Sequence, residues 1–148
     1  MIFDNYYIMV PLIAWAIAQA IKVTLESLKE KRFKFSRFFG NGGMPSGHAA
    51  IVSSLSVVTL MERGVTSIEF GIVTIFSLII LADAIGVRYE TGKQAKAIND
   101  LVEDLNENKI DVEIRQLKEQ VGHRPIEVLA GTILGSAIAY VIYGLELL

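Results

Sequence analysis

Long apolar runs constrain the fold of this chain more than any other feature of its sequence. A helix needs roughly 20 apolar residues to cross the hydrocarbon core of a bilayer, and a backbone inside lipid must satisfy its own hydrogen bonds, as a helix does. Hydrophobic residues make up 52% of the chain, too many for an ordinary soluble domain. The sequence therefore predicts an all-α integral membrane protein, a helical bundle in one domain over residues 1–148. About four transmembrane helices are predicted, over residues 6–25, 44–61, 67–87 and 126–146.

The second run, residues 44–61, is short and contains Ser53, Ser54 and Ser56. It can cross the bilayer if other helices surround it and satisfy its polar groups. The alternative is a re-entrant or tilted helix. The first and last runs carry small residues that allow helices to pack closely: Ala14, Ala16, Ala18 and Ala20 in the first, Gly131 and Gly135 in the last.

A polar stretch, residues 89–122, separates the third run from the last. Its apolar residues recur at helical spacing, which predicts two amphipathic helices that pack on the bundle or cap it at the membrane interface. The longer stripe is Ala95, Ile98, Leu101, Val102 and Leu105, and the shorter one is Ile114, Leu117 and Val121. Gly122 suits the C-terminus of the second helix.

A Gly-rich turn, residues 40–48, leads directly into the second apolar run. Ser46 can cap the N-terminus of that helix and leave backbone N–H groups pointing outward. Together with Gly47 and the positive end of the helix dipole, this turn favours an anion such as phosphate. His48 follows in the first helical turn, where it can transfer a proton.

The second histidine of the chain, His123, opens the last run, with Glu127 one helical turn further on. A carboxylate at this spacing can reach an imidazole N–H, which selects the tautomer and stabilises the cationic ring. Such a histidine can attack phosphorus, and His48 opposite it could protonate the leaving oxygen.

Counting the crossings places the ionisable residues of both motifs at one membrane face, which we call the motif face. Cations there would hold the phosphoryl oxygens as charge develops. The gathered residues are Lys22, Arg37, Ser46, His48, Asp83, Arg88, Lys93, His123, Arg124 and Glu127.

Two of these residues allow a purely structural interpretation as well. Lys22 is either a cation aimed into the site or an anchor that extends to the interface. Asp83 is a site candidate because an acid at that depth is costly, but it can equally pair with Arg88 or Lys22. No tight cluster of acids and histidines has metal-ligand spacing, and cysteines are lacking, so no metal or other cofactor is expected.

Positive charge is distributed unevenly between the two faces. Of the 14 Lys and Arg residues, all but Arg63 fall on the motif face. The motif face is therefore predicted to be cytoplasmic, with both termini outside, in a protein of the plasma membrane. The basic, aromatic segment 26–39 is expected to contact anionic lipid headgroups rather than nucleic acid.

The motifs resemble those of a known superfamily. Pro45-Ser46-Gly47-His48 is similar to the Pro-Ser-Gly-His motif of the type-2 phosphatidic acid phosphatases, relatives of the vanadium-dependent haloperoxidases. His123 and Glu127 resemble their His-x-x-x-Asp element, with Glu in place of Asp. More closely, the chain resembles the small divergent branch of that superfamily. The similar stretches are residues 18–22, 42–48, 83–88, 92–95 and 122–128.

The resemblance implies roles for the motif residues. His123 would be the nucleophile that forms a phosphohistidine, and His48 would be the acid. Ser46 and Gly47 would bind phosphate, and Glu127 would orient the nucleophile.

The chain departs from the family's first motif, a Lys followed by Arg-Pro. Here Lys31 precedes Arg37 by one residue fewer than in the family, and Phe38 replaces the Pro. Lys22 is therefore an equal candidate for the lysine that holds phosphate.

The function expected from these features is a membrane-embedded, metal-independent phosphatase. Its substrate would be a lipid phosphate or an isoprenoid pyrophosphate. The alternative is a catalytically silent membrane protein that binds a phosphorylated lipid or a protein partner through the same pocket. A small transporter or scaffold is a further possibility.

Overall fold

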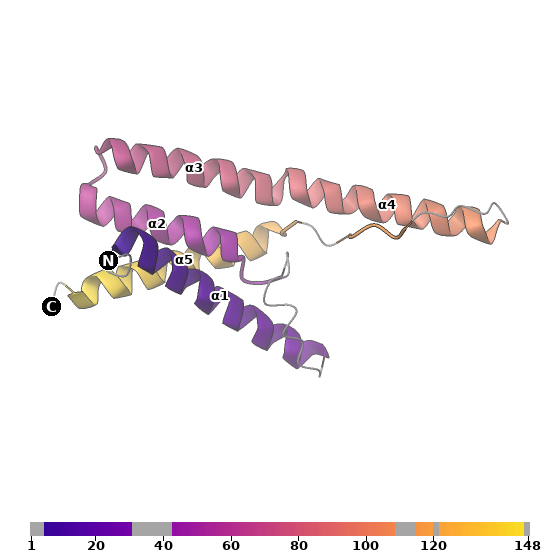
Figure 1. Cartoon of the computed structure of the whole chain (residues 1–148), viewed down its shortest axis with the longest axis horizontal. Coiled ribbons are helices and arrows are strands. Elements are labelled where there is room, and N and C mark those ends of the chain that lie inside the picture. The colour runs from indigo at the N-terminus through magenta and orange to yellow at the C-terminus, as the bar shows by residue number, and fades with distance from the viewer. Residues whose placement is uncertain (1–4, 31–42, 109–114, 120–121, 147–148) are drawn as a thin grey trace.

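The computed structural model describes residues 5–30, 43–108, 115–119 and 122–146. Every regular element within these ranges is an α-helix, and the helices form a bundle with one long extension (Figure 1). They are α1 (Tyr6–Glu30), α2 (Gly47–Arg63), α3 (Ile68–Ile85), α4 (Val87–Glu107) and α5 (Pro125–Glu146). The predicted fold class, an all-α helical membrane bundle, is confirmed.

Three helical segments in the described part of the chain are long and apolar enough to cross a membrane. They are α1, the rod formed by α3 and α4, and α5. The remaining predicted span, residues 44–61, corresponds to α2, which has 17 residues. At a rise of 1.5 Å per residue α2 is about 26 Å long, slightly less than the roughly 30 Å of a hydrocarbon core.

Helix α2 lies at the centre of the bundle, in contact with α1, α3 and α5. Its hydroxyl groups are satisfied inside the protein, which explains how so polar a helix can be buried. Ser54 and Thr59 each donate to a carbonyl about one turn earlier in α2, and Ser56 shares a hydrogen bond of 2.9 Å with Ser77 of α3. Other helices surround α2 and its polar groups have partners, which is the condition that was predicted for this run to cross the bilayer.

The closest packing in the bundle joins α2 to α5. A Cβ atom added at Gly131 would lie 2.3 Å from the carbonyl oxygen of Ser46, and one added at Gly135 would lie 2.3 Å from that of Ala50. The two glycines therefore let the backbones of α2 and α5 approach closely, as their spacing in the sequence predicted.

Small residues in α1 divide between two faces. Ala14 and Ala18 are fully buried and pack against Ala50 of α2, whereas Ala16 and Ala20 are exposed. The prediction that all four alanines support close packing is therefore half right. Residues four apart share a helix face, and those two apart do not.

Helices α3 and α4 follow one another with only Gly86 between them and run as one rod, whose second half extends beyond the bundle (Figure 1). The apolar side chains of α3 largely face outward, including Ile68, Ile72, Phe76 and Ile79. This exposure fits a helix that faces lipid on most of its surface.

The polar stretch after α3 differs from the prediction of two amphipathic helices. The first is present as α4, but residues 115–119, where the second was predicted, are not helical. Residues 114 and 121 of its stripe lie outside the described residues. The Asn99 side chain explains the difference, because its amide donates to the carbonyl of Leu117 and its oxygen accepts from the Leu117 N–H. These bonds hold the non-helical segment 115–119 alongside α4.

Gly122 is not a helix C-terminus as predicted. It lies against the start of α4, where an added Cβ would be 2.3 Å from the backbone nitrogen of Tyr89. The absence of a side chain at Gly122 therefore allows the chain to pass close to the start of α4 before α5 begins.

The close contact of α2 with α5 predicts different effects of the same substitution within α5. Gly135→Ala places a methyl group on the Ala50 carbonyl and on the Ser53 hydroxyl. It should destabilise the protein by about 1–3 kcal/mol through overpacking. Gly144→Ala is the control, since no atom lies within 4 Å of the added Cβ. Thermal unfolding in detergent would measure both, and equal melting temperatures for the two variants would contradict the packing described.

Candidate active site

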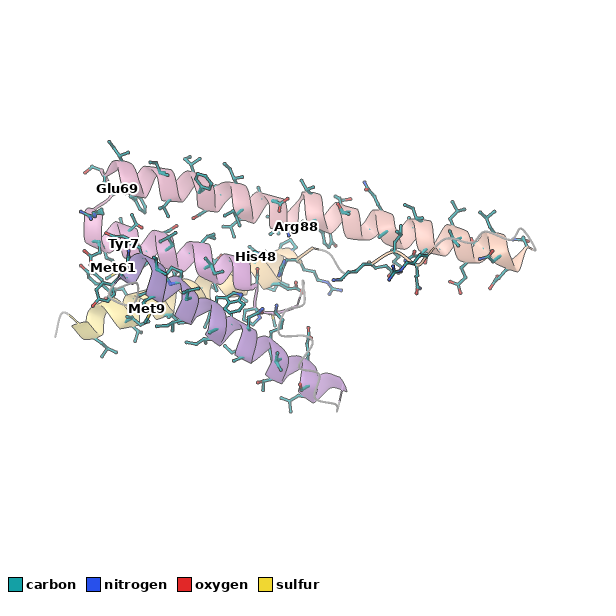
Figure 2. All side chains as sticks on the ribbon, viewed as in Figure 1. Tyr7, Met9, His48, Met61, Glu69 and Arg88 are labelled. Atoms are coloured by element: carbon teal, nitrogen blue, oxygen red, sulfur yellow. The ribbon has the colours of Figure 1, made fainter. Side chains whose placement is uncertain are left out.

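The two histidines of the chain meet at one end of the bundle. His48 lies in the first turn of α2, and His123 lies two residues before α5. Their ring centroids are 5.8 Å apart, with the ring planes at 84°. Figure 2 shows His48 near Arg88 at the end of the bundle from which α4 extends, while Tyr7, Met61 and Glu69 lie at the opposite end. The structure thus brings together two residues that are 75 positions apart in the sequence.

Backbone hydrogen bonds hold both histidines in place. The Ser46 N–H donates to the carbonyl of Glu127 at 2.9 Å, which ties the start of α2 to the first turn of α5. The His123 N–H donates to the carbonyl of Ala84 near the end of α3 at 3.1 Å. Three helices therefore fix the backbone on which the imidazole pair stands.

Two cations lie within electrostatic reach of the imidazole pair, Lys22 from α1 and Arg88 from α4. Lys22 is only 3% exposed, and the charges of Glu26 and Glu127 act on it. Gly43 lies directly over the Lys22 side chain, since an added Cβ would be 3.3 Å from its Cδ atom. Lys22 is therefore enclosed beside the site, which favours its interpretation as a site cation over a surface anchor.

Asp83 forms an ion pair with Arg88, through Oδ2 and Nε. The bond restrains the guanidinium at the junction of α3 and α4, close to His48. Of the two sequence interpretations, the structure shows the pairing with Arg88. The structure therefore connects Asp83 to the site through its ion pair with Arg88.

Glu127 does not hydrogen-bond His123 in this structure. Its carboxylate instead accepts from the Arg124 N–H at 3.2 Å, at the start of α5. Within the described part of the chain, neither ring nitrogen of His123 has a hydrogen-bond partner, although both are buried. The spacing of the two residues allows the predicted contact, but the Glu127 carboxylate instead caps the start of α5 by accepting from the Arg124 N–H.

Ser46 caps α2 as predicted, because its Oγ accepts from the Ala49 N–H. The side chain is fully buried, and its backbone N–H is bonded to Glu127. Gly47 is also buried and packs against Trp15. The structure therefore gives these two residues a role in positioning His48, and it leaves their predicted contact with phosphate untested.

The remaining predicted cations are distributed around the site. Lys93 pairs with Glu90 at 2.8 Å, on the exposed surface of α4. Lys93 and Arg124 both line a cavity between α4 and the segment that leads to α5. Arg37 lies outside the described residues. Sequence reasoning missed Tyr89 and Lys96, which line the same cavity; the spacing of Lys96 three residues after Lys93 was the available signal.

Comparisons with known proteins identify the family of this chain. The family described as the Divergent PAP2 family matches residues 3–138. This chain belongs to that family. It is also 35% identical to the "Uncharacterized membrane protein YuiD" of Bacillus subtilis, over 93% of this chain and 94% of the relative. No solved structure matches the chain.

In this divergent PAP2 protein, His123 is held in its uncharged form. Burial of the ring lowers its pKa to about 4, and the neighbouring charges of His48, Lys22 and Arg88 lower it in the same direction. A neutral imidazole keeps a free lone pair, so a nucleophilic role for His123 is chemically available at neutral pH.

A histidine titration would test this environment directly, because the divergent PAP2 protein has only two histidines to resolve. We expect the His123 ring signal in NMR spectra of the detergent-solubilised protein to stay constant from pH 8 to pH 5. It should then titrate near the pKa of about 4. The spectrum of His123→Gln assigns the signal, and a midpoint at or above the ordinary histidine value would contradict the buried site.

Proposed function

We propose that this protein is a membrane-embedded phosphatase that hydrolyses a lipid phosphate or an isoprenoid diphosphate. The proposal is carried by one observation, the edge-to-face pair of His48 and His123 at 5.8 Å. Membership of the PAP2-related family supports it. The lipid tail would remain in the bilayer while its phosphate enters the site at the end of the bundle.

The first chemical step is attack on the substrate. A ring nitrogen of His123 donates its lone pair to phosphorus, and the bond from phosphorus to the leaving oxygen breaks. The leaving oxygen takes a proton from His48, which is the more exposed of the two rings. The products of this step are a free lipid alcohol, or a lipid monophosphate, and a phosphohistidine on His123.

The second step regenerates the enzyme. A water molecule attacks the phosphohistidine, and His48 accepts its proton as the P–N bond breaks. Inorganic phosphate leaves and His123 is again neutral. The net reaction consumes one water for each phosphate released, and the protein's own residues carry every proton transfer in it.

Lys22 and Arg88 support both steps electrostatically. Negative charge on the phosphoryl oxygens would lie between these cations, which the fold holds in place before the substrate binds. Asp83 keeps the Arg88 guanidinium oriented. The buried position of Lys22 strengthens its effect, because a charge is screened less away from water.

The proposed activity is tested by phosphate release from phosphatidic acid and from an isoprenoid diphosphate, in detergent with EDTA present. Activity should persist in EDTA and be blocked by vanadate. His123→Ala should lower the rate by about 10³-fold or more, and His48→Ala by about 10²–10⁴-fold. Lys118→Ala, which changes an exposed residue of segment 115–119, should leave the rate unchanged.

Covalent labelling adds a readout specific to the mechanism. Radioactive phosphate from the substrate should be trapped on the protein in an acid-labile form, and His123→Ala should abolish this labelling. A His123→Ala variant that retains activity would refute the mechanism. Lipid binding without turnover by the unmodified protein would instead support the alternative function, a silent receptor for phosphorylated lipid.

The proposed orientation places the motif face in the cytoplasm of the cell and the protein in the plasma membrane. The support is the charge distribution, with 13 of 14 Lys and Arg residues on that face. The start of α1 and the end of α5 lie together at the other end of the bundle, beside the turn from α2 to α3 (Figure 1).

Reporter fusions test this orientation. A reporter at either terminus should be active only outside the cell, because both ends of the chain are expected there. A fusion within the polar stretch after α4, for example after Asn108, should read cytoplasmic and serves as the internal control. A cytoplasmic signal from both terminal fusions would reverse the orientation.

A further inference from the structure

A cavity of about 370 Å³ lies beside the imidazole pair, between α4 and the segment that leads to α5. Its lining shares Gly122, Arg124 and Glu127 with the surroundings of His123. The other lining residues are Tyr89, Gly92, Lys93, Lys96 and Glu119. Its volume is in the range of small-molecule sites, so the cavity can hold more than a few water molecules.

The position of the cavity is on the aqueous side of the bundle. Lys96 is 11 residues beyond Ile85, the last residue of the apolar helix α3, which corresponds to roughly 16 Å along a helix. That distance exceeds the thickness of one polar interfacial layer, about 5–8 Å. For a hydrocarbon core that ends at Ile85, the Lys96 side of the cavity is therefore in water rather than among lipid tails.

The cavity wall opposite α4 is formed by the segment that includes residues 115–119, and the Asn99 side chain of α4 holds this segment in place. Asn99 makes paired hydrogen bonds of 2.9 and 2.8 Å with the backbone of Leu117, and its amide also donates to the Glu119 carboxylate at 2.9 Å. This contact keeps segment 115–119 beside α4. The cavity is thus a built feature of the fold.

Three of the five charged side chains that line the cavity are cations. Lys93, Lys96 and Arg124 provide three cations against the carboxylates of Glu119 and Glu127. Both carboxylates already accept hydrogen bonds, from Asn99 and from the Arg124 N–H respectively. Lys93 is partly neutralised by Glu90. Within the described residues, Lys96 and the Arg124 side chain have no acidic partner.

We propose that this cavity is a second phosphate-binding site on the aqueous side of the imidazole pair, with Lys96 and Arg124 as its principal cations. It would bind either inorganic phosphate, the product of the proposed reaction, or the phosphorylated part of a polar headgroup. The statement that phosphate is a reaction product rests on the proposed function, but the binding of phosphate in the cavity does not.

The test is a binding measurement on the full-length protein in nanodiscs of neutral lipid. Inorganic phosphate and glycerol 3-phosphate are titrated separately and followed by ³¹P NMR. Lys96→Ala should weaken binding by about tenfold, since it removes a charge-assisted hydrogen bond. Lys118→Ala, an equal change of charge outside the cavity lining, should alter binding by less than about twofold. Melting temperatures confirm that both variants fold.

His123→Ala separates the two sites. Unchanged phosphate binding in this variant, together with loss in Lys96→Ala, supports the cavity as a distinct site. Binding that is lost in His123→Ala but kept in Lys96→Ala would overturn the proposal. Comparable affinity for both probes identifies free phosphate as a sufficient ligand, whereas binding of glycerol 3-phosphate alone identifies a headgroup.

The outcomes also distinguish this proposal from the proposed function. Phosphate binding that depends on Lys96 in a protein without phosphatase activity would support the cavity and refute the enzyme. Phosphatase activity in a protein whose phosphate binding is unchanged in Lys96→Ala would support the enzyme and overturn the second phosphate site.

Discussion

The contact between the backbones of α2 and α5 is the interaction on which the rest of the structure depends. Gly131 and Gly135 allow it, because any side chain there would collide with carbonyl groups of α2. The hydrogen bond from Ser46 to Glu127 then sets how the two helices are aligned along their length. Since His48 and His123 stand at the starts of these helices, a packing contact made of small residues determines the geometry of the imidazole pair.

Burial in an apolar bundle makes each polar group depend on a specific partner. The hydroxyls of α2 find carbonyls of their own helix or the hydroxyl of Ser77. His123 differs, because both of its ring nitrogens are buried without a partner among the described residues. Such a group is costly for stability, and the same burial keeps the ring uncharged. In the proposed mechanism, an uncharged His123 is what the attack on phosphorus requires.

The sequence predictions that proved wrong share one physical cause. Glu127 has the right spacing to reach His123, but the helix start offers its carboxylate a nearer donor, the Arg124 N–H. Segment 115–119 was predicted to be helical from an apolar stripe that includes Leu117, but Asn99 binds its backbone and the segment is not helical. In both cases the predicted contact or helix is replaced by a hydrogen bond to a group whose position depends on the folded chain. Lys96 was overlooked although it follows Lys93 by three residues, because its place in the cavity lining depends on the folded chain.

The sequence by itself determined the class of the protein, the approximate bounds of the four apolar helices α1, α2, α3 and α5, and the family to which it belongs. Apolar run length, helix caps and short motifs are properties of neighbouring residues, and hydrophobic burial enforces them wherever the chain folds. Only the tertiary structure decided that α2 is the central helix, that Lys22 is enclosed beside the histidines and that a cationic cavity adjoins them. Those features arise from contacts between segments far apart in sequence, which side-chain packing and hydrogen bonds select together.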